Sequence, residues 1–274
     1  MIDDLARGYA VDGFELAWDR WGPDDGVPLV LCHGFSGSTH DFALQIEALA
    51  QERPVVSIDH RGHGRSSKSG VDADYTVEHV VGDVTAWIDA EVGGPVDLLG
   101  HSMGGRVAMR LALRRPDLLR SLILMDTTAW RFGVDDPEIA ALATAFFEGL
   151  TPGTDFAVPP TDEDPLIEAT TTTAWRATKA EHQAGFDIAA ARALGTELFA
   201  DRLPPVGDRL GEITVPVTVI VGELDGLIAD HAPRLADGVA DGELVTIDGA
   251  YHSPQLTHPD AWRDALRRHF ARLD

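Results

Sequence analysis

The sequence has a single cysteine, few basic residues and no long apolar run. Cys32 is the only cysteine among 274 residues, which excludes an intrachain disulfide and thiol-based metal sites. The 22 Lys and Arg residues are outnumbered by 45 Asp and Glu, a formal net charge of −23. Nucleic acids and anionic membranes bind cationic surfaces. We therefore expect neither of them as a partner.

The chain also lacks signals for export or membrane insertion. Residues 1–4 have neither the basic start nor the apolar core of a secretion signal, and no apolar run approaches the roughly 20 residues that span a bilayer. We therefore expect a cytoplasmic protein, either a monomer or a homodimer. The length suits one large α/β domain or two small ones, with enough chain to bury a sizeable core.

Apolar runs of strand length alternate with helical patterns before residue 129 and after residue 211. A hairpin is predicted over residues 9–21, with Asp12-Gly13 as its turn. The alternation that follows predicts a mostly parallel sheet with helices on both faces. Ligands of such sheets bind beyond the carboxyl ends of the strands. The predicted strands are 28–32, 54–59, 95–99, 119–125, 215–221 and 243–247.

Residues 130–210 break this rhythm, with helical patterns at 138–149, 164–182 and 185–200 and no convincing central strand. We interpret this stretch as a helical cap inserted into a core formed by residues 1–129 and 211–274. Some cap aromatic residues are expected to face an apolar substrate, although for any single one of them packing of the cap helices on each other and on the core is favoured. The stretch holds eight of the 19 aromatic residues: Trp130, Phe132, Phe146, Phe147, Phe156, Trp175, Phe186 and Phe199.

The stretch 100–105, Gly-His-Ser-Met-Gly-Gly, joins the predicted strand 95–99 directly to a helical pattern over residues 106–113. A strand that turns into a helix within a few residues strains the corner residue, and only small neighbours fit around it. The hydroxyl of Ser102 is then exposed, and its backbone lies at a helix N-terminus, which stabilises negative charge. This arrangement is the nucleophile elbow G-x-S-x-G.

A serine nucleophile needs a histidine base, and the histidine needs a carboxylate. The chain order Ser102, Asp225, His252 matches that expected after a nucleophile elbow, and Asp225 and His252 each follow a predicted strand. Asp126 also ends a strand on this face and is the alternative acid. His60 and His63 lie near an aspartate, but a glycine turn explains them better than a metal site does, and we expect no metal.

Two backbone N–H groups are needed to bind the oxyanion of a tetrahedral intermediate. Met103, directly after the nucleophile, should supply one. Phe35, in the loop that follows the strand 28–32, is the best candidate for the other, and Gly34 beside it should contact substrate. Trp130, Phe146 and Trp175 are the cap residues we expect at the substrate.

These motifs resemble the α/β-hydrolase superfamily over nearly the whole chain. The matching pieces are His33-Gly34-Phe35, Asp59-x-Arg61-Gly62-x-Gly64-x-Ser66, the stretch 100–105, Gly222-x-x-Asp225 and His252. The resemblance implies an eight-stranded, mostly parallel sheet with a helical cap and no cofactor. Within the superfamily, epoxide hydrolases and haloalkane dehalogenases use an aspartate nucleophile, whereas this elbow carries Ser102.

The sequence therefore predicts a serine hydrolase that cleaves carboxylic esters of small-to-medium apolar substrates. An enol-lactone or carbon–carbon bond hydrolase with the same three residues is the alternative. Carbon–carbon hydrolases of this fold typically have Asn before the serine and Trp after the histidine, where this chain has His101 and Ser253. A third possibility is a ligand receptor that keeps the fold and has little turnover.

Overall fold

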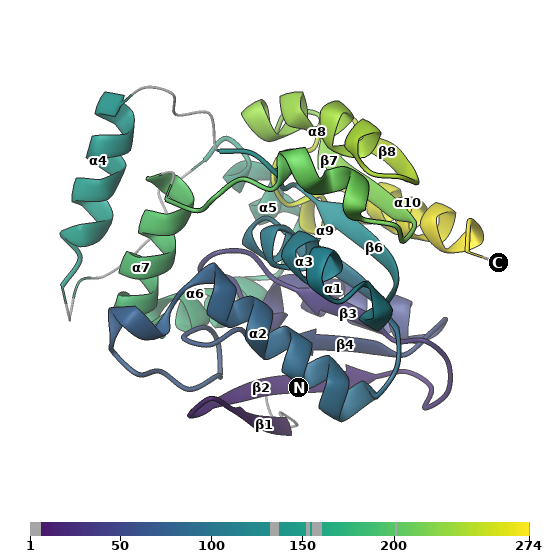
Figure 1. Cartoon of the computed structure of the whole chain (residues 1–274), viewed down its shortest axis with the longest axis horizontal. Coiled ribbons are helices and arrows are strands. Elements are labelled where there is room, and N and C mark those ends of the chain that lie inside the picture. Colours follow the sequence, from purple (N-terminus) through teal and green to yellow (C-terminus); the bar gives the residue numbers. More distant parts are fainter. Residues whose placement is uncertain (1–6, 132–136, 152–153, 155–160, 201, 274) are drawn as a thin grey trace.

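One eight-stranded sheet forms the centre of the computed structural model, which describes residues 7–131, 137–151, 154, 161–200 and 202–273 (Figure 1). Its spatial order is β1-β2-β4-β3-β5-β6-β7-β8. β2 is antiparallel to β1 and β4, and every other pairing is parallel, so the predicted mostly parallel sheet is confirmed. The strands are β1 (Arg7–Val11), β2 (Phe14–Trp21), β3 (Leu29–Cys32), β4 (Val55–Ile58), β5 (Val96–His101), β6 (Leu119–Met125), β7 (Val217–Gly222) and β8 (Gly242–Ile247).

Helices cover both faces of this sheet. The α-helices are α1 (Ala43–Ala50), α2 (Val77–Trp87), α3 (Met103–Arg114), α4 (Pro137–Glu148), α5 (Asp164–Thr170), α6 (Thr173–Ala184), α7 (Ile188–Phe199), α8 (Gly226–Gly238), α9 (Pro254–Thr257) and α10 (Pro259–Ala271). Short segments are the 3₁₀-helices η1 (Thr39–Phe42), η2 (Asp72–Asp74), η4 (Pro116–Leu118) and η5 (Gly207–Glu212), and the π-helix η3 (Ile88–Val92).

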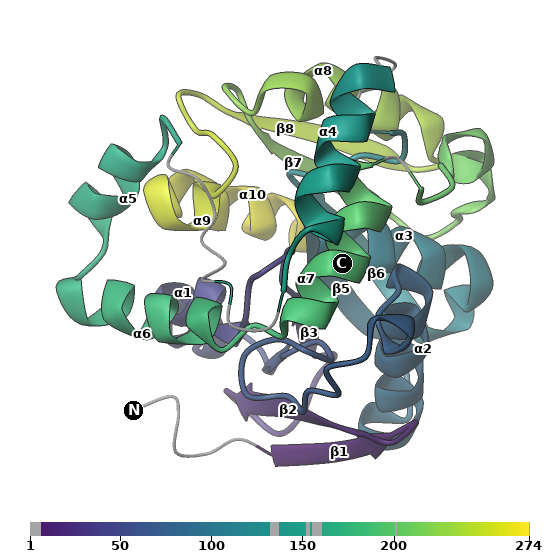
Figure 2. The same ribbon diagram turned by 90° about the vertical axis from the view of Figure 1, so that its left-hand side faces the viewer.

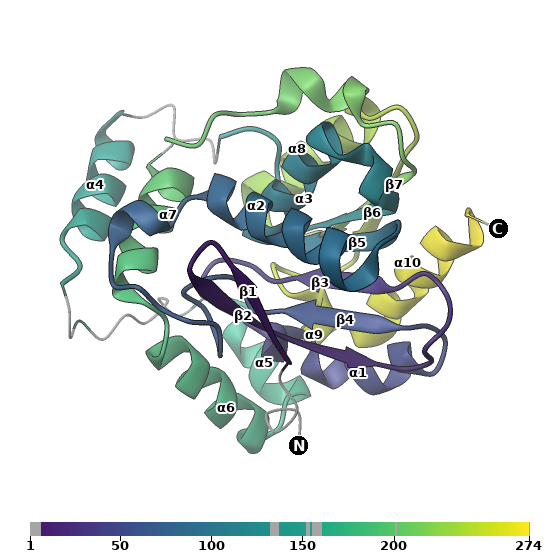
Figure 3. The same ribbon diagram turned by 60° about the horizontal axis from the view of Figure 1, so that its bottom comes forward.

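The sheet separates two hydrophobic cores. Successive strand residues point to opposite faces, so Val30 and Cys32 join the core beneath α2, α3 and α8, whereas Leu29 and Leu31 join the core beneath α1 and α10 (Figure 3). All residues of β3, β4 and β5 are buried, as expected of parallel strands covered on both sides. The continuous apolar runs in the sequence are the consequence.

The N-terminal hairpin forms where its turn residues predict. Val11 pairs with Phe14, and Asp12 and Gly13 between them both have positive φ, at 47° and 81°. Two such residues in succession make a two-residue turn whose twist matches the flanking strands. Glycine adopts this conformation without a steric penalty, and aspartate tolerates it better than most residues.

Three local expectations differ from the structure. The pattern over 164–182 is two helices, because the Thr172 side chain accepts a hydrogen bond from the Trp175 N–H at 3.1 Å and caps a new helix, α6. The sequence pattern also predicts a helix over roughly 230–240, whereas α8 begins earlier, at Gly226. The short helix α9, between the predicted His252 loop and α10, was not expected.

Four α-helices of the described residues, α4 to α7, lie between β6 and β7 in the chain, and we call them the inserted helices. Figures 1 and 2 show them gathered on one side of the sheet, with α4 beside α7 and α5 beside α9. The described part of 130–210 contains helices and no strand, as the sequence predicts. None of the helices in the described ranges is long and apolar enough to cross a membrane.

The junction between β5 and α3 is tight. Ser102 is the single residue between the strand and the helix, and its φ of 54° and ψ of −113° lie in a strained region. A Cβ added at Gly100 would lie 2.3 Å from the Gly104 carbonyl oxygen, and one added at Gly104 would lie 2.3 Å from that of Cys32. Because these neighbours are backbone atoms, only glycine fits at both positions.

Gly104→Ala should therefore destabilise the fold by about 1–3 kcal/mol, the usual cost of overpacking a close contact. Gly82→Ala is the matched control, since Gly82 lies in the exposed face of α2 and a Cβ there meets nothing within 4 Å. This control should gain up to about 1 kcal/mol from helix propensity. Urea denaturation measures both, and equal midpoints for the two variants would contradict the account of the junction.

Candidate active site

Ser102, Asp225 and His252 lie beyond the carboxyl ends of β5, β7 and β8. Since these strands run parallel, their carboxyl ends share one edge of the sheet. His252 Nδ1 donates to Asp225 Oδ2 at 2.8 Å. Ser102 and His252 line the same cavity, which has a volume of about 370 Å³. The structure thus brings the three predicted residues together.

The other candidate acid, Asp126, is bonded to the end of β7 rather than to His252. It is fully buried, and its Oδ1 accepts a hydrogen bond from the Gly222 N–H at 2.8 Å. Burial, and then the nearby charge of Asp225, raise the pKa of Asp126 well above its ordinary value. The carboxylate that accepts the hydrogen bond from His252 Nδ1 belongs to Asp225. Of the two carboxyl groups, Asp225 is therefore the one placed to orient the histidine.

The histidine lies in an electronegative environment. Burial lowers the pKa of His252, but the hydrogen bond and charge of Asp225, with a further contribution from Glu163, outweigh it and raise the pKa above its ordinary value. Because Nδ1 carries the proton shared with Asp225, the neutral ring presents Nε2 as a base. This tautomer is the one that general-base chemistry at a serine requires.

The predicted oxyanion-hole residues adjoin Ser102. Gly34 and Phe35 line the cavity, and a Cβ added at Gly34 would lie 3.2 Å from the Ser102 Cβ, so the loop after β3 packs directly on the elbow. Met103 is the first residue of α3, where backbone N–H groups have no partner within the helix. Such N–H groups at a helix N-terminus can bind negative charge.

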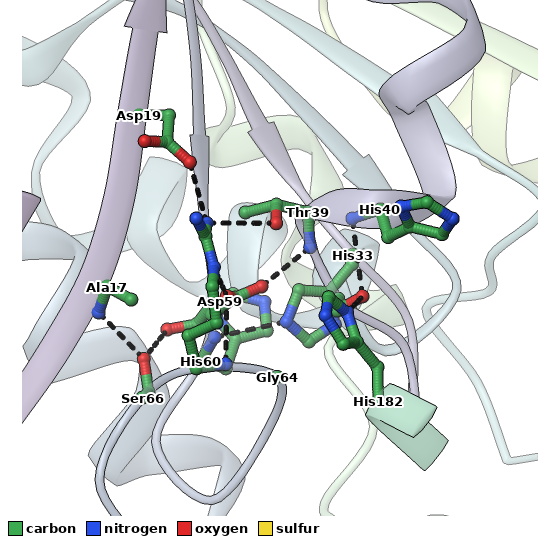
Figure 4. Close-up of polar contacts among 12 residues, drawn as sticks. Ala17, Asp19, His33, Thr39, His40, Asp59, His60, Gly64, Ser66 and His182 are labelled. Carbon is green, nitrogen blue, oxygen red and sulfur yellow. Dashed lines mark hydrogen bonds and ion pairs between the residues drawn. The ribbon is translucent and has the colours of Figure 1, made fainter. Parts of the chain in front are cut away.

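Buried polar contacts hold this loop against the turn after β4 (Figure 4). His33 Nδ1 donates to the Gly34 carbonyl at 2.8 Å, and His33 Nε2 accepts from the His60 N–H at 3.0 Å. Burial, and then the nearby His60, lower the pKa of His33, so its ring stays neutral and can both donate and accept. Asp59 Oδ1 accepts from the Thr39 N–H at 2.6 Å and ties η1 to the same turn.

His60 and His63 belong to that turn. His63 Nδ1 donates to the Arg61 carbonyl at 2.9 Å, and burial, followed by His60, lowers the pKa of His63 to about 3. Their rings lie 4.2 Å and 5.0 Å from that of His33, centroid to centroid. In the part of the chain that the structure describes, no group of three or more His, Cys, Asp or Glu side chains is placed to hold a metal ion.

His101, directly before the nucleophile, contacts the histidine as well. Its Nε2 donates to the His252 carbonyl at 2.8 Å, and the two rings lie 4.9 Å apart. Burial, followed by His252, lowers the pKa of His101 to about 4, so this ring is neutral. From the sequence alone, the position of His101 inside the glycine turn predicts only that it shapes the elbow backbone. Its contact with His252 spans 151 residues and has no signature in the local pattern.

Of the three aromatic residues expected at the substrate, the structure brings only Trp175 to this cavity. Its ring stacks on His40 at 5.1 Å, and its Nε1 donates to the His40 carbonyl at 3.2 Å. The guanidinium carbon of Arg234 lies 4.1 Å from the centroid of the Trp130 ring, and the Phe146 side chain is 52% exposed. Trp130 and Phe146 are absent from the described lining of the cavity.

Other aromatic residues of the inserted helices pack on Phe35, in the loop after β3. The rings of Phe147, Phe186 and Phe199 lie 5.9 Å, 5.4 Å and 5.5 Å from that of Phe35. The structure therefore agrees with the alternative that these three residues pack the helices against their neighbours instead of facing substrate. Two further aromatic residues of the stretch, Phe132 and Phe156, lie outside the described residues.

The cavity is more polar than the aromatic content suggests. Lys179 forms an ion pair with Asp41, and the Glu163 carboxylate accepts a hydrogen bond from the Ser253 N–H at 2.6 Å. Sequence reasoning missed these residues, because contacts between the inserted helices and the core depend on how the two dock. The charged residues in the lining are Asp41, Glu163, Asp164, Arg176 and Lys179.

Known proteins resemble this chain along most of its length. The family model described as alpha/beta hydrolase fold matches residues 27–259. A protein of Rhizobium rhizogenes named "Putative carbamate hydrolase RutD" is 30% identical over 256 residues, which cover 89% of this chain and 92% of that protein.

Solved structures resemble it as well. A thermophilic esterase from Thermogutta terrifontis is 26% identical with a TM-score of 0.78, covering 98% of this chain and 99% of that one. Est816, described as an N-acyl homoserine lactone degrading enzyme, is 26% identical with a TM-score of 0.74, covering 95% and 99%. The chain belongs to the alpha/beta hydrolase fold family and is a hydrolase.

Proposed function

We propose that this hydrolase cleaves carboxylic esters of small to medium size through an acyl-enzyme formed on Ser102. The observation that carries the proposal is the 2.8 Å hydrogen bond between His252 Nδ1 and Asp225, beside the cavity that holds the strained Ser102. A serine hydroxyl is a poor nucleophile at neutral pH and needs an adjacent base. His252, oriented by Asp225, supplies it.

In the first step, His252 Nε2 accepts the Ser102 proton while Oγ attacks the ester carbonyl. The resulting imidazolium is stabilised by the Asp225 carboxylate, and the oxyanion by the backbone N–H groups of Met103 and Phe35. Collapse of the tetrahedral intermediate breaks the bond to the alcohol, which takes the proton from His252. Water, deprotonated by the same ring, then hydrolyses the acyl-enzyme and frees Ser102.

The volume and lining of the cavity support a compact substrate of mixed polarity. At about 370 Å³, the cavity is near the small end of ligand pockets. Phe35, Ile167 and Leu256 give it apolar walls, while charged residues such as Arg176 and Lys179 give it polar ones. We therefore propose an ester with an apolar and a polar part, rather than the purely apolar substrate that the aromatic content suggests.

We infer that the inserted helices, within residues 130–210, act as a cap over the site. Trp175, on α6, lines the cavity together with Ser102. Two contacts hold α6 against η1 and the loop before it. They are the ion pair of Lys179 with Asp41, and the 2.8 Å hydrogen bond between His182 Nδ1 and Ser38 Oγ. A cap fixed in this way excludes water from the reacting groups.

Lactone hydrolysis is the second candidate, and the likeness to Est816 favours it. A lactone is a cyclic ester, so the same residues open it by the same steps, and an enol-lactone is one such substrate. Carbon–carbon cleavage has less support, because His101 and Ser253 occupy the positions where those hydrolases typically carry Asn and Trp.

Ser102→Ala should lower ester hydrolysis by at least about 10⁴-fold, since the nucleophile is lost while binding is retained. Initial rates on p-nitrophenyl esters from acetyl to palmitoyl, measured for both proteins, should peak at short or medium acyl chains. Unchanged turnover in Ser102→Ala would contradict the proposal. If folded wild type hydrolyses these esters negligibly but opens an enol-lactone rapidly, lactone hydrolysis is favoured instead.

Asp225→Asn should lower kcat by roughly 10⁴-fold, because the amide no longer selects the required His252 tautomer. Asp126→Asn should keep most of kcat, since Asp126 bonds to the Gly222 backbone and not to the histidine. The burial-raised pKa of Asp126 means that ionising it costs stability as the pH rises. Asp126→Asn should therefore be at least as stable as wild type in urea at pH 8. The reverse order of kcat losses would identify Asp126 as the acid.

A further inference from the structure

Glu163, in the segment between β6 and β7, contacts the loop that carries His252. Glu163 lies directly before α5, yet its Oε1 accepts a hydrogen bond from the backbone N–H of Ser253 at 2.6 Å. Its side chain lines the cavity but is only 5% exposed. A carboxylate this buried is costly unless it has partners. Burial raises the pKa of Glu163, and the Ser253 N–H opposes that rise.

The Ser253 N–H and the His252 carbonyl belong to the same peptide unit. His101 Nε2 donates to that carbonyl at 2.8 Å. The peptide is thus held on one side by the end of β5 and on the other by Glu163, while Asp225 holds the imidazole ring. Three side chains from separate parts of the chain therefore orient His252.

The charges that surround His252 can be assigned element by element. Asp225, before α8, and Glu163, before α5, both favour its protonated form. His101, at the end of β5, is neutral, and Asp126, after β6, is fully buried with its pKa raised by burial and then by the charge of Asp225. α9, which follows the histidine, contains Pro, Gln, Leu and Thr and has no titratable side chain.

The remaining charged groups of the cavity have partners of their own. Asp41 is paired with Lys179. Arg176 donates to the backbone carbonyls of Glu168 and Thr171, at 3.0 Å and 2.8 Å. Asp164 accepts from the Thr161 N–H at 2.9 Å. Among the described residues, Asp225 and Glu163 are thus the carboxylates bonded to the histidine or to the peptide after it.

We propose that Glu163 is a positioning residue for His252: its carboxylate holds the peptide after the histidine, and its negative charge favours the imidazolium formed when Ser102 attacks. The inference rests on the proposed function, since it assigns Glu163 a part in the same reaction. It also links the packing of the inserted helices on the core to catalysis. If α5 moves away, the histidine loses one backbone anchor and one neighbouring charge together.

Two variants separate these contributions. Glu163→Gln keeps an oxygen that can accept from the Ser253 N–H and removes the charge, whereas Glu163→Ala removes both. Glu168→Gln is the matched control, because it removes one negative charge from an exposed position on α5, outside the cavity lining. The readout is kcat/KM for p-nitrophenyl butyrate between pH 5 and pH 9, with thermal midpoints to establish folding.

The acid limb of this profile reports the pKa of the free-enzyme base. Glu163→Gln should shift the acid limb to lower pH, because a negative charge that favours protonated His252 has gone. Glu163→Ala should show the same shift and, in addition, a plateau lowered by roughly 10- to 100-fold, since the peptide is no longer held. Glu168→Gln should follow the wild-type profile. A purely structural role would alter stability without moving the acid limb.

An acid limb in Glu163→Gln that coincides with that of wild type would overturn the proposal, and so would an unchanged plateau in folded Glu163→Ala. If Glu163→Ala does not fold, the profile of Glu163→Gln decides. If wild type shows no Ser102-dependent turnover, the proposed function fails separately. The titration of the His252 ring by NMR, assigned with His252→Gln, then tests Glu163 directly. Its midpoint should be lower in Glu163→Gln, and an equal midpoint would overturn the inference.

Discussion

The turn from β5 into α3 at a single residue is the constraint on which the rest of the site depends. Ser102 can take its strained conformation only because Gly100 and Gly104 allow the helix to approach the strand and the neighbouring carbonyl of Cys32. The same turn points the first N–H groups of α3 toward the space in front of the hydroxyl. The strain is tolerated because the surrounding sheet is buried on both faces and cannot relax around it.

Around this corner, loops from several strands are held by buried polar contacts. The loop after β3 depends on a neutral His33 that donates to Gly34 and accepts from His60. A buried histidine can make both contacts only when it is uncharged, which agrees with its lowered pKa. Phe35 adds an apolar anchor, since its ring packs among aromatic residues of the inserted helices. The loop after β3 is therefore supported by the core and by the inserted helices together.

Much of the fold could be predicted, because each buried parallel strand appears in the sequence as an apolar run, and several of these runs are followed by a turn that contains glycine. The three residues of the site could also be proposed, since each follows such a strand. The chain order favoured Asp225 as the acid and left Asp126 as the alternative. Both residues end strands on one face, and the structure distinguishes them by their partners: Asp225 is bonded to His252, and Asp126 to the Gly222 N–H.

The inserted helices show where sequence reasoning stops. Helical patterns predict that α4, α6 and α7 form, but a pattern does not tell which face meets substrate, so Trp175 and Phe146 could not be distinguished. The break between α5 and α6 was not predicted. It falls in a run of threonines, of which Thr172 caps the second helix. The contact of Glu163 with Ser253 joins residues 90 positions apart and follows from docking rather than from any local motif.

The central claim is that Ser102 is a nucleophile activated by His252, and covalent labelling tests it most directly. The protein would be incubated with a fluorophosphonate and digested, and the modified peptide located by mass spectrometry. The account predicts one phosphonylated residue, Ser102, with no labelling in Ser102→Ala and much slower labelling in His252→Gln. An unlabelled wild-type protein that is shown to be folded, or a label on another residue, would contradict it.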